Sequence, residues 1–214
     1  MRRRLDGSVR WTEGANPEIV RRDVKPANGR TRIPVSGSKE VGVVGLDLSL
    51  TRSAAVFLPA GWSPADPWKG IAWTTSGYAV EGSDPKALVH RRSVIASELR
   101  AFATKHRCRH VAREDLVGGL AAFQGLRLAL LAGAVDDQFW LMCGIVVRPI
   151  NVSSARKTLL GRLPQKGKAQ AVADAIARLN PPWRDDRGRI PADEGDSFAI
   201  SNHARSLLGM PCMV

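Results

Sequence analysis

Apolar residues recur with two different periods along the chain, and these periods predict the order of strands and helices. The run VGVVGLDL, which starts at Val41, is almost continuously apolar and predicts a central strand buried on both faces of a sheet. Two more strands are expected over 52–59 and 70–80, and short connections favour an antiparallel arrangement of these three. Further short strands are expected over 108–115 and 144–150.

Helical periodicity begins after the third strand. Asp84 and Pro85 open a helix with apolar residues on one face and basic residues on the other. A long, mostly apolar helix is expected over 119–142, and shorter helices over 154–160, 166–179 and 193–208. This order predicts an α/β fold with a five-stranded mixed sheet flanked by helices.

The third of these helices has recognisable end signals. Ser153 and Ser154 are candidate N-caps, because their hydroxyl oxygens can accept from the first free backbone N–H groups. Gly161 is expected to end the helix, since glycine adopts the left-handed conformation found there.

The first part of the chain differs in composition from the rest. Residues 1–39 contain ten lysines and arginines, with scattered glycines, prolines and serines and no apolar period. They predict a flexible basic arm, or an extension without a role, ahead of one folded domain over residues 40–214.

Composition and charge narrow the class of protein. Hydrophobic residues make up 44% and charged residues 24% of the chain, which excludes a globally disordered or fibrous protein. The net charge of +12 favours nucleic acid as a partner, with an anionic membrane surface as the alternative. No apolar run reaches the ~20 residues of a membrane-spanning helix. The basic first residues are not followed by the apolar stretch of a signal peptide, so no secretion signal is expected. Three widely spaced cysteines without a CxxC pair fit a reducing compartment, so a cytoplasmic location is expected.

Two carboxylates stand at the ends of predicted strands. Asp47 interrupts an apolar run, and a carboxylate in a buried strand is costly unless it is paired or bound to a metal. The alternative is an Asp that bonds the backbone of Ser49 or Thr51. Glu114 ends the fourth predicted strand and is either a surface residue or a neighbour of Asp47, if the first and fourth strands are parallel and adjacent.

Two more carboxylates lie near the start of the last predicted helix. Asp193 and Asp196 in DEGDSFAIS are three residues apart, so they share one helix face within reach of one or two cations. They also fit a plain helix N-terminus, with Asp193 as the cap and Asp196 favourable to the helix dipole. Oxygen ligands without a nearby His or Cys suit Mg²⁺ or Mn²⁺. Two such ions catalyse phosphodiester cleavage in many enzymes, so the carboxylates and the basic charge together predict a nuclease.

The order and spacing of these segments resemble a known family. VGLDLSLTRSAAVFL, HVAREDL, VVRPINVSSARKTLLG, KGKAQAVADAI and DEGDSFAIS are similar to the RuvC family of Holliday junction resolvases, within the RNase H-like superfamily. The likeness spans 41–208. It implies an RNase H-like fold and a crossover junction endodeoxyribonuclease that nicks four-way or other branched DNA in pairs. It also implies a bacterial or phage-encoded homodimer, with a branch-migration or recombination protein as a further partner.

The resemblance also implies roles for individual residues. Asp47, Glu114, Asp193 and Asp196 match the four acidic positions that hold two Mg²⁺ ions per active site, with Mn²⁺ expected to substitute. Arg156 or Lys157, together with Lys168, match a basic stretch that contacts DNA phosphates.

Some positions depart from the family pattern. Val117 stands where the family often has a Phe that helps to open the junction, and Phe123 is a candidate substitute. His203 lies two turns after Asp196 and is a minor candidate for the same site. The six tryptophans are expected mostly in packing, with three in predicted loops as candidates for stacking on DNA bases: Trp62, Trp68 and Trp183.

Two other functions remain open on the sequence. A catalytically inactive RNase H-like module would bind branched DNA without cutting it. GLDLSLTRSA also resembles the first phosphate loop of sugar kinases and actin-like ATPases. Those proteins need a second comparable domain, for which 214 residues leave no room.

Overall fold

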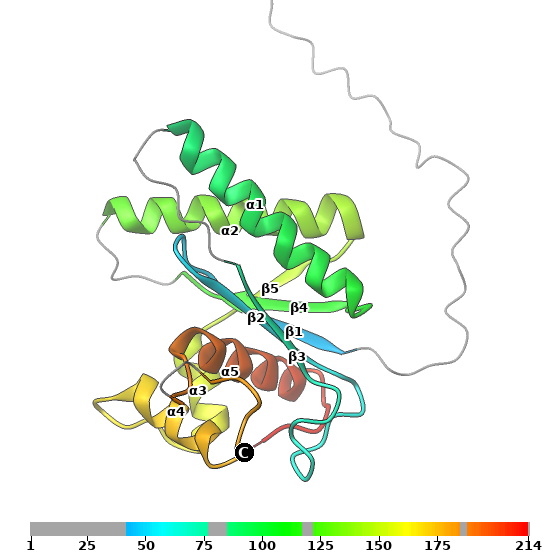
Figure 1. The fold of residues 1–214 in the computed structure, drawn as a ribbon, viewed down its shortest axis with the longest axis vertical. Coiled ribbons are helices and arrows are strands. Elements are labelled where there is room, and N and C mark those ends of the chain that lie inside the picture. Colours follow the sequence, from blue (N-terminus) through cyan, green and yellow to red (C-terminus); the bar gives the residue numbers. More distant parts are fainter. Residues whose placement is uncertain (1–41, 77–84, 117–121, 185–187, 214) are drawn as a thin grey trace, which may run out of the picture. The chain divides into compact units, whose positions relative to one another are not determined.

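The computed structural model describes residues 42–76, 85–116, 122–184 and 188–213, with the backbone alone for 122–124 (Figure 1). All of them belong to one compact unit, Ser38–Val214. The predicted basic arm, residues 1–39, lies outside the described residues, and so does Val117.

Five strands form one mixed sheet in the order β3-β2-β1-β4-β5. The strands are β1 (Val43–Asp47), β2 (Ser53–Leu58), β3 (Ala72–Ser76), β4 (His110–Glu114) and β5 (Val147–Ile150). The first three form an antiparallel meander, whereas β4 runs parallel to β1 and β5 parallel to β4. The predicted five-stranded mixed sheet is confirmed, and its central strand is the apolar run identified in the sequence.

Helices cover both faces of the sheet (Figure 1). One face carries α1 (Pro85–Lys105) and α2 (Ala122–Cys143), and the other carries α3 (Val152–Leu160), α4 (Lys168–Ala177) and α5 (Ala192–Leu207). Successive side chains of β1 point to opposite faces of the sheet and so contribute to both helical layers. Val44 and Leu46 pack with α1 and α2, while Val43 packs with the other three helices. By the same alternation Asp47 faces the layer that contains α5.

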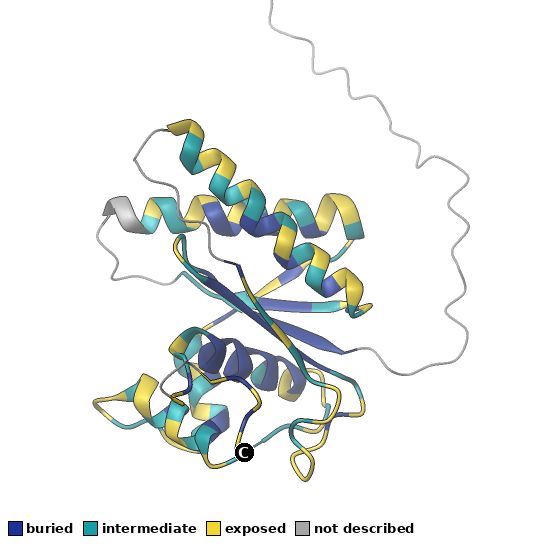
Figure 2. Ribbon diagram, viewed as in Figure 1, coloured by how far each residue is buried: buried dark blue, intermediate teal, exposed yellow. Residues whose placement is uncertain are grey.

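Helix α5 lies closest to the centre of the fold, and Figure 2 shows it almost entirely buried. Gly45 on β1 permits its close approach, since a Cβ at this position would meet backbone atoms of Ser197 and Ser201. The hydroxyls of these serines are buried and donate to Ala54 O at 3.0 Å and Val56 O at 2.7 Å on β2. Small and polar residues therefore bind α5 tightly to the sheet.

The helix ends differ in part from expectation. The N-cap of α3 is Asn151, whose Oδ1 accepts from the backbone N–H groups of Ser153 and Ser154, so the prediction that these serines are the caps is wrong. The chain enters α3 two residues earlier than expected, which places both serines in its first turn. Gly161 ends α3 with φ of 72°, as predicted.

The tryptophans of the loops are packing residues. Trp62 and Trp183 are 2% and 3% exposed and pack around Phe198 of α5 with the partly buried Trp68. The indole N–H of Trp62 donates to Pro67 O, and that of Trp68 to Leu179 O. The proposal that these three rings stack on DNA bases is therefore wrong, because the rings fill the core beneath α5.

Within the part of the chain that the structure describes, no helix is long and apolar enough to span a membrane.

Candidate active site

The site begins at the carboxyl ends of β1 and β4. Leu46 of β1 is the parallel partner of Arg113 of β4, and the next residues, Asp47 and Glu114, are the last of their strands. Both project to the face covered by α5, since residues of parallel neighbouring strands in register share a face. The expectation that these two strand ends converge is confirmed.

Asp47 and Glu114 lie close enough for their carboxyl groups to share a hydrogen bond. Burial and the negative charge of Glu114 raise the pKa of Asp47 to about 8, with smaller contributions from Asp196 and Asp193. Burial also raises the pKa of Glu114, although its hydrogen bond from Asp47 acts in the opposite direction. Two carboxylates in one half-buried place hold a proton between them because their charges repel.

The local alternatives for Asp47 and Glu114 are not what the structure shows. The backbone N–H of Ser49 donates to Ser53 Oγ at 3.0 Å, and that of Thr51 donates to Ser49 Oγ at 3.3 Å. The turn after β1 is therefore closed by hydroxyl groups and leaves the Asp47 carboxyl to face Glu114. Glu114 is only partly exposed and is no plain surface residue.

Helix α5 brings Asp196 to this pair. Asp196 is 8% exposed, and Arg156 of α3 holds it through two hydrogen bonds, Nε to Oδ1 at 2.8 Å and Nη2 to Oδ2 at 2.5 Å. This pair raises the pKa of Arg156, and the negative charges of Glu114 and Asp47 add to the effect. Arg156 therefore lies among three of the four predicted carboxylates.

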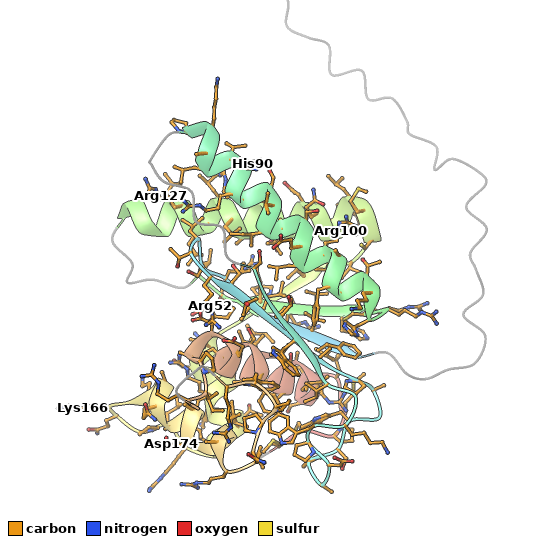
Figure 3. All side chains as sticks on the ribbon, viewed as in Figure 1. Arg52, His90, Arg100, Arg127, Lys166 and Asp174 are labelled. Carbon is orange, nitrogen blue, oxygen red and sulfur yellow. The ribbon has the colours of Figure 1, made fainter. Side chains whose placement is uncertain are left out.

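Asp193 is held by a second arginine, which sequence reasoning did not single out. Arg52, between β1 and β2, donates from Nη1 to Asp193 at 2.9 Å and from Nη2 to Glu194 at 2.5 Å. Figure 3 labels Arg52 between the sheet and α5. Asp193 does not cap the helix, because Pro191 is the N-cap and makes no side-chain bond.

Glu194 is a fifth carboxylate beside the predicted four. Its residue is 4% exposed, and one oxygen, Oε2, has no hydrogen-bond partner among the described residues. Glu194 lies between Asp193 and Asp196 in the segment DEGD, but no apolar periodicity there indicates which side of the helix is buried. Its burial is therefore evident only from the packing of α5.

The predicted phosphate-binding residues fall into two groups. Arg156 is directed to Asp196, whereas Lys157 is exposed on α3 and Lys168 is half-buried at the start of α4. Lys166, labelled in Figure 3, projects from the connection between these helices, which also carries the exposed Arg162. Several basic residues therefore follow Arg156 along α3 and its connection to α4.

Two minor candidates have different outcomes. His203 Nδ1 lies 2.7 Å from Thr158 Oγ1 on α3, so its ring packs between helices and not with the carboxylates. The side chain of Phe123 lies outside the described residues.

The chemistry of the donors fits a divalent cation. Asp47, Glu114 and Asp196 supply carboxylate oxygens, and the repulsion among their charges is one that a cation would relieve. In their present positions no three His, Cys, Asp or Glu side chains of the described residues form a metal-sized cluster. Asp196 and Asp193 instead direct their oxygens to Arg156 and Arg52.

Comparison of the structure with solved structures gives a consistent result. A Thermus thermophilus RuvC structure aligns with a TM-score of 0.57 and 16% identity, over 81% of this chain and all of that chain. T. thermophilus RuvC in complex with a Holliday junction substrate also aligns with a TM-score of 0.57, at 13% identity, over 79% of this chain and 96% of that chain. The fold is RNase H-like, as in RuvC. No protein-family model and no curated protein sequence matches the chain.

Proposed function

We propose that this protein is a Mg²⁺-dependent, structure-selective DNA endonuclease that resolves four-way junctions or other branched DNA by paired nicks. The observation that carries the proposal is that Asp47 and Glu114 meet at the carboxyl ends of two parallel strands, with Asp196 of α5 near enough to act on both electrostatically. Ligand and active sites of open α/β sheets occur at such strand ends.

The position of each residue supports its proposed role. Asp47, Glu114, Asp196 and Asp193 would hold Mg²⁺, which would activate water and stabilise the leaving oxygen of a phosphodiester. Lys157 and Lys168 would bind the DNA backbone, since Lys157 is exposed next to Arg156 on α3 and Lys168 begins the following helix, α4. The net charge of +12 supplies long-range attraction to DNA.

The apolar surface of α2 supports a homodimer, in which two such sites would face one junction. Large apolar side chains on α2 and just after it are about half exposed or more: Leu126, Leu130, Trp140, Leu141, Met142 and Val146. A monomer seldom leaves such a surface uncovered. A second copy of this chain is the partner we propose, since symmetric self-association is the commonest way to cover a patch of this kind.

A catalytically inactive module that binds branched DNA is the second candidate. The observation that favours it is the pairing of Asp196 with Arg156 and of Asp193 with Arg52, which occupies two of the four carboxylates.

Cleavage of an end-labelled immobile four-way junction in Mg²⁺ separates the two candidates. We expect symmetric nicks by the wild type, no cutting of a matching linear duplex, and loss of activity by at least about a thousandfold in Asp47→Asn, as for other groups central to catalysis. Asp66→Asn, in an exposed loop between β2 and β3, is the matched control and should cut normally.

The other outcomes are equally informative. Tight junction binding without cutting in Mg²⁺ or Mn²⁺ identifies the inactive module. Cutting of junction and duplex alike indicates a nuclease without structure selectivity, and cutting that survives Asp47→Asn contradicts the proposed active site.

A further inference from the structure

The guanidinium group of Arg156 has two candidate partners, a DNA phosphate and Asp196. Its place on α3, next to Lys157, suits contact with a DNA phosphate, but in the structure it is bound to Asp196 by two hydrogen bonds. Its side chain is 17% exposed and that of Asp196 12%, so this is a largely buried pair. This pairing uses two of the five N–H donors of the guanidinium and compensates its positive charge, so Arg156 attracts a DNA phosphate less strongly than an unpaired arginine would.

Arg156 supplies positive charge to the carboxylates that the proposed divalent cation would bind. Besides Asp196, the carboxylates that act on it electrostatically are Glu114 and Asp47. These same three groups repel one another when Arg156 is left out of account. One arginine therefore supplies positive charge to three carboxylates that a divalent cation would otherwise neutralise.

Arg52 differs from Arg156 in how it is anchored. One of its two acidic partners, Glu194, is almost fully buried and lies outside the four proposed ligands. If Asp193 turned to a cation, Arg52 would keep Glu194 as a partner. Arg156 has no second acidic hydrogen-bond partner among the described contacts, so without Asp196 it would keep no hydrogen bond to a carboxylate.

We propose that Arg156 is an internal stand-in for the metal: it neutralises Asp196 until a divalent cation takes its place, and it then turns to a phosphate of the bound DNA. The proposal rests on the proposed metal-dependent site. Asp47, Glu114, Asp193, Glu194 and Asp196 carry five negative charges when ionised, against two positive charges from Arg52 and Arg156. A divalent cation that binds Asp196 repels the adjacent guanidinium, and the nearest large source of negative charge is then the DNA backbone.

The proposed exchange of Arg156 for a cation predicts two measurable effects in the full-length protein. Removal of the positive charge in Arg156→Gln should tighten Mn²⁺ binding about tenfold in calorimetric titration without DNA, because the cation no longer competes with an arginine. The same variant should weaken junction binding more in Ca²⁺ than in EDTA, because the charge of Arg156 is released from Asp196 only in the cation-bound protein.

Companion variants separate charge from folding. Arg156→Lys keeps the charge and should bind Mn²⁺ like the wild type, while Arg156→Met removes the charge and keeps a long apolar stem, so it should behave like Arg156→Gln. Arg109→Gln is the control for loss of one positive charge. Arg109 is exposed just before β4, at the end of that strand opposite to Glu114. Its loss should leave Mn²⁺ affinity unchanged.

The sign of the change decides the matter. Weaker or equal Mn²⁺ binding in both Arg156→Gln and Arg156→Met overturns the exchange and makes Arg156 a positioning residue for Asp196. Equal loss of junction affinity in EDTA and Ca²⁺ also overturns it. If the two variants bind Mn²⁺ more tightly and the wild type cuts no junction, the exchange is upheld and the nuclease is refuted. No Mn²⁺ binding by the wild type refutes both.

Discussion

Asp47 is the single residue at which burial and charge conflict most strongly. It ends the central strand, faces Glu114, and has its backbone N–H bonded to Ser197 Oγ at 3.1 Å. Its pKa of about 8 means that, without a metal, the folded protein keeps a proton at neutral pH that the unfolded chain releases near pH 3.8. The folded state therefore binds more protons than the unfolded state between these values, and its stability falls as the pH rises through that interval.

The first prediction concerns Asp47→Asn in EDTA. The substitution should raise the free energy of unfolding by about 2 kcal/mol at pH 8 and by much less at pH 5, because Asn carries no charge to bury and solvent reduces the full effect of the pKa shift. Urea unfolding at several pH values measures it, with Asp66→Asn as the control. A gain that is equal at both pH values would contradict the assigned pKa.

At the scale of elements, the contact between β1 and α5 decides where the carboxylates meet. Gly45 lies two residues before Asp47 on the same face of β1, directly against α5. Ser197 lies one residue after Asp196 and bonds both Asp47 and Ala54. The position of Asp196 relative to Asp47 therefore depends on the direct packing of α5 against the backbone of β1 at Gly45.

The second prediction follows from that close approach. Gly45→Ala should destabilise the fold by about 3 kcal/mol, because the added Cβ would overlap backbone atoms of α5 that cannot move independently. Urea unfolding monitored by circular dichroism measures the loss. Gly61→Ala is the control, since a Cβ at Gly61 meets nothing within 4 Å. A loss below about 1 kcal/mol would show that α5 can shift away from the sheet.

At the scale of the whole molecule, the two faces of the sheet differ in what they leave exposed. The α3, α4 and α5 layer surrounds the acidic site, whereas the α1 and α2 layer carries the apolar surface of α2. On α2 the exposed apolar residues become denser toward its end, at Trp140, Leu141 and Met142. Self-association through this layer would leave both acidic sites uncovered.

The third prediction tests this arrangement. Leu141→Glu should shift a dimer toward monomer by at least about tenfold in dissociation constant, because it places a charge in an apolar contact. Sedimentation equilibrium measures the change. Leu207→Glu is the matched control, since Leu207 is 52% exposed on α5 in the opposite layer. Dissociation by both variants, or by neither, would contradict an interface on α2.

The amino-acid sequence by itself determined the order of elements and singled out two charges at strand ends, whereas the meeting of those ends depended on the strand order. Nearly continuous apolar runs mark β1, and alternation or helical periods mark the elements after it, because each is a local pattern of burial. Asp47 and Glu114 stand out for the same reason, since each is a charge at the end of an apolar segment. Asn151 was missed as a cap because adjacent serines offer equally good local chemistry.

Only the tertiary structure decided which charges pair. Arg52 and Asp193 are 141 residues apart in the chain, and Arg156 and Asp196 are 40 apart, so no local pattern connects them. The burial of Glu194 and the packing of Trp62 and Trp183 under α5 likewise depend on side chains from distant segments. Local periodicity fixes what each segment becomes, but the free energy of a buried charge depends on neighbours that only the packed fold supplies.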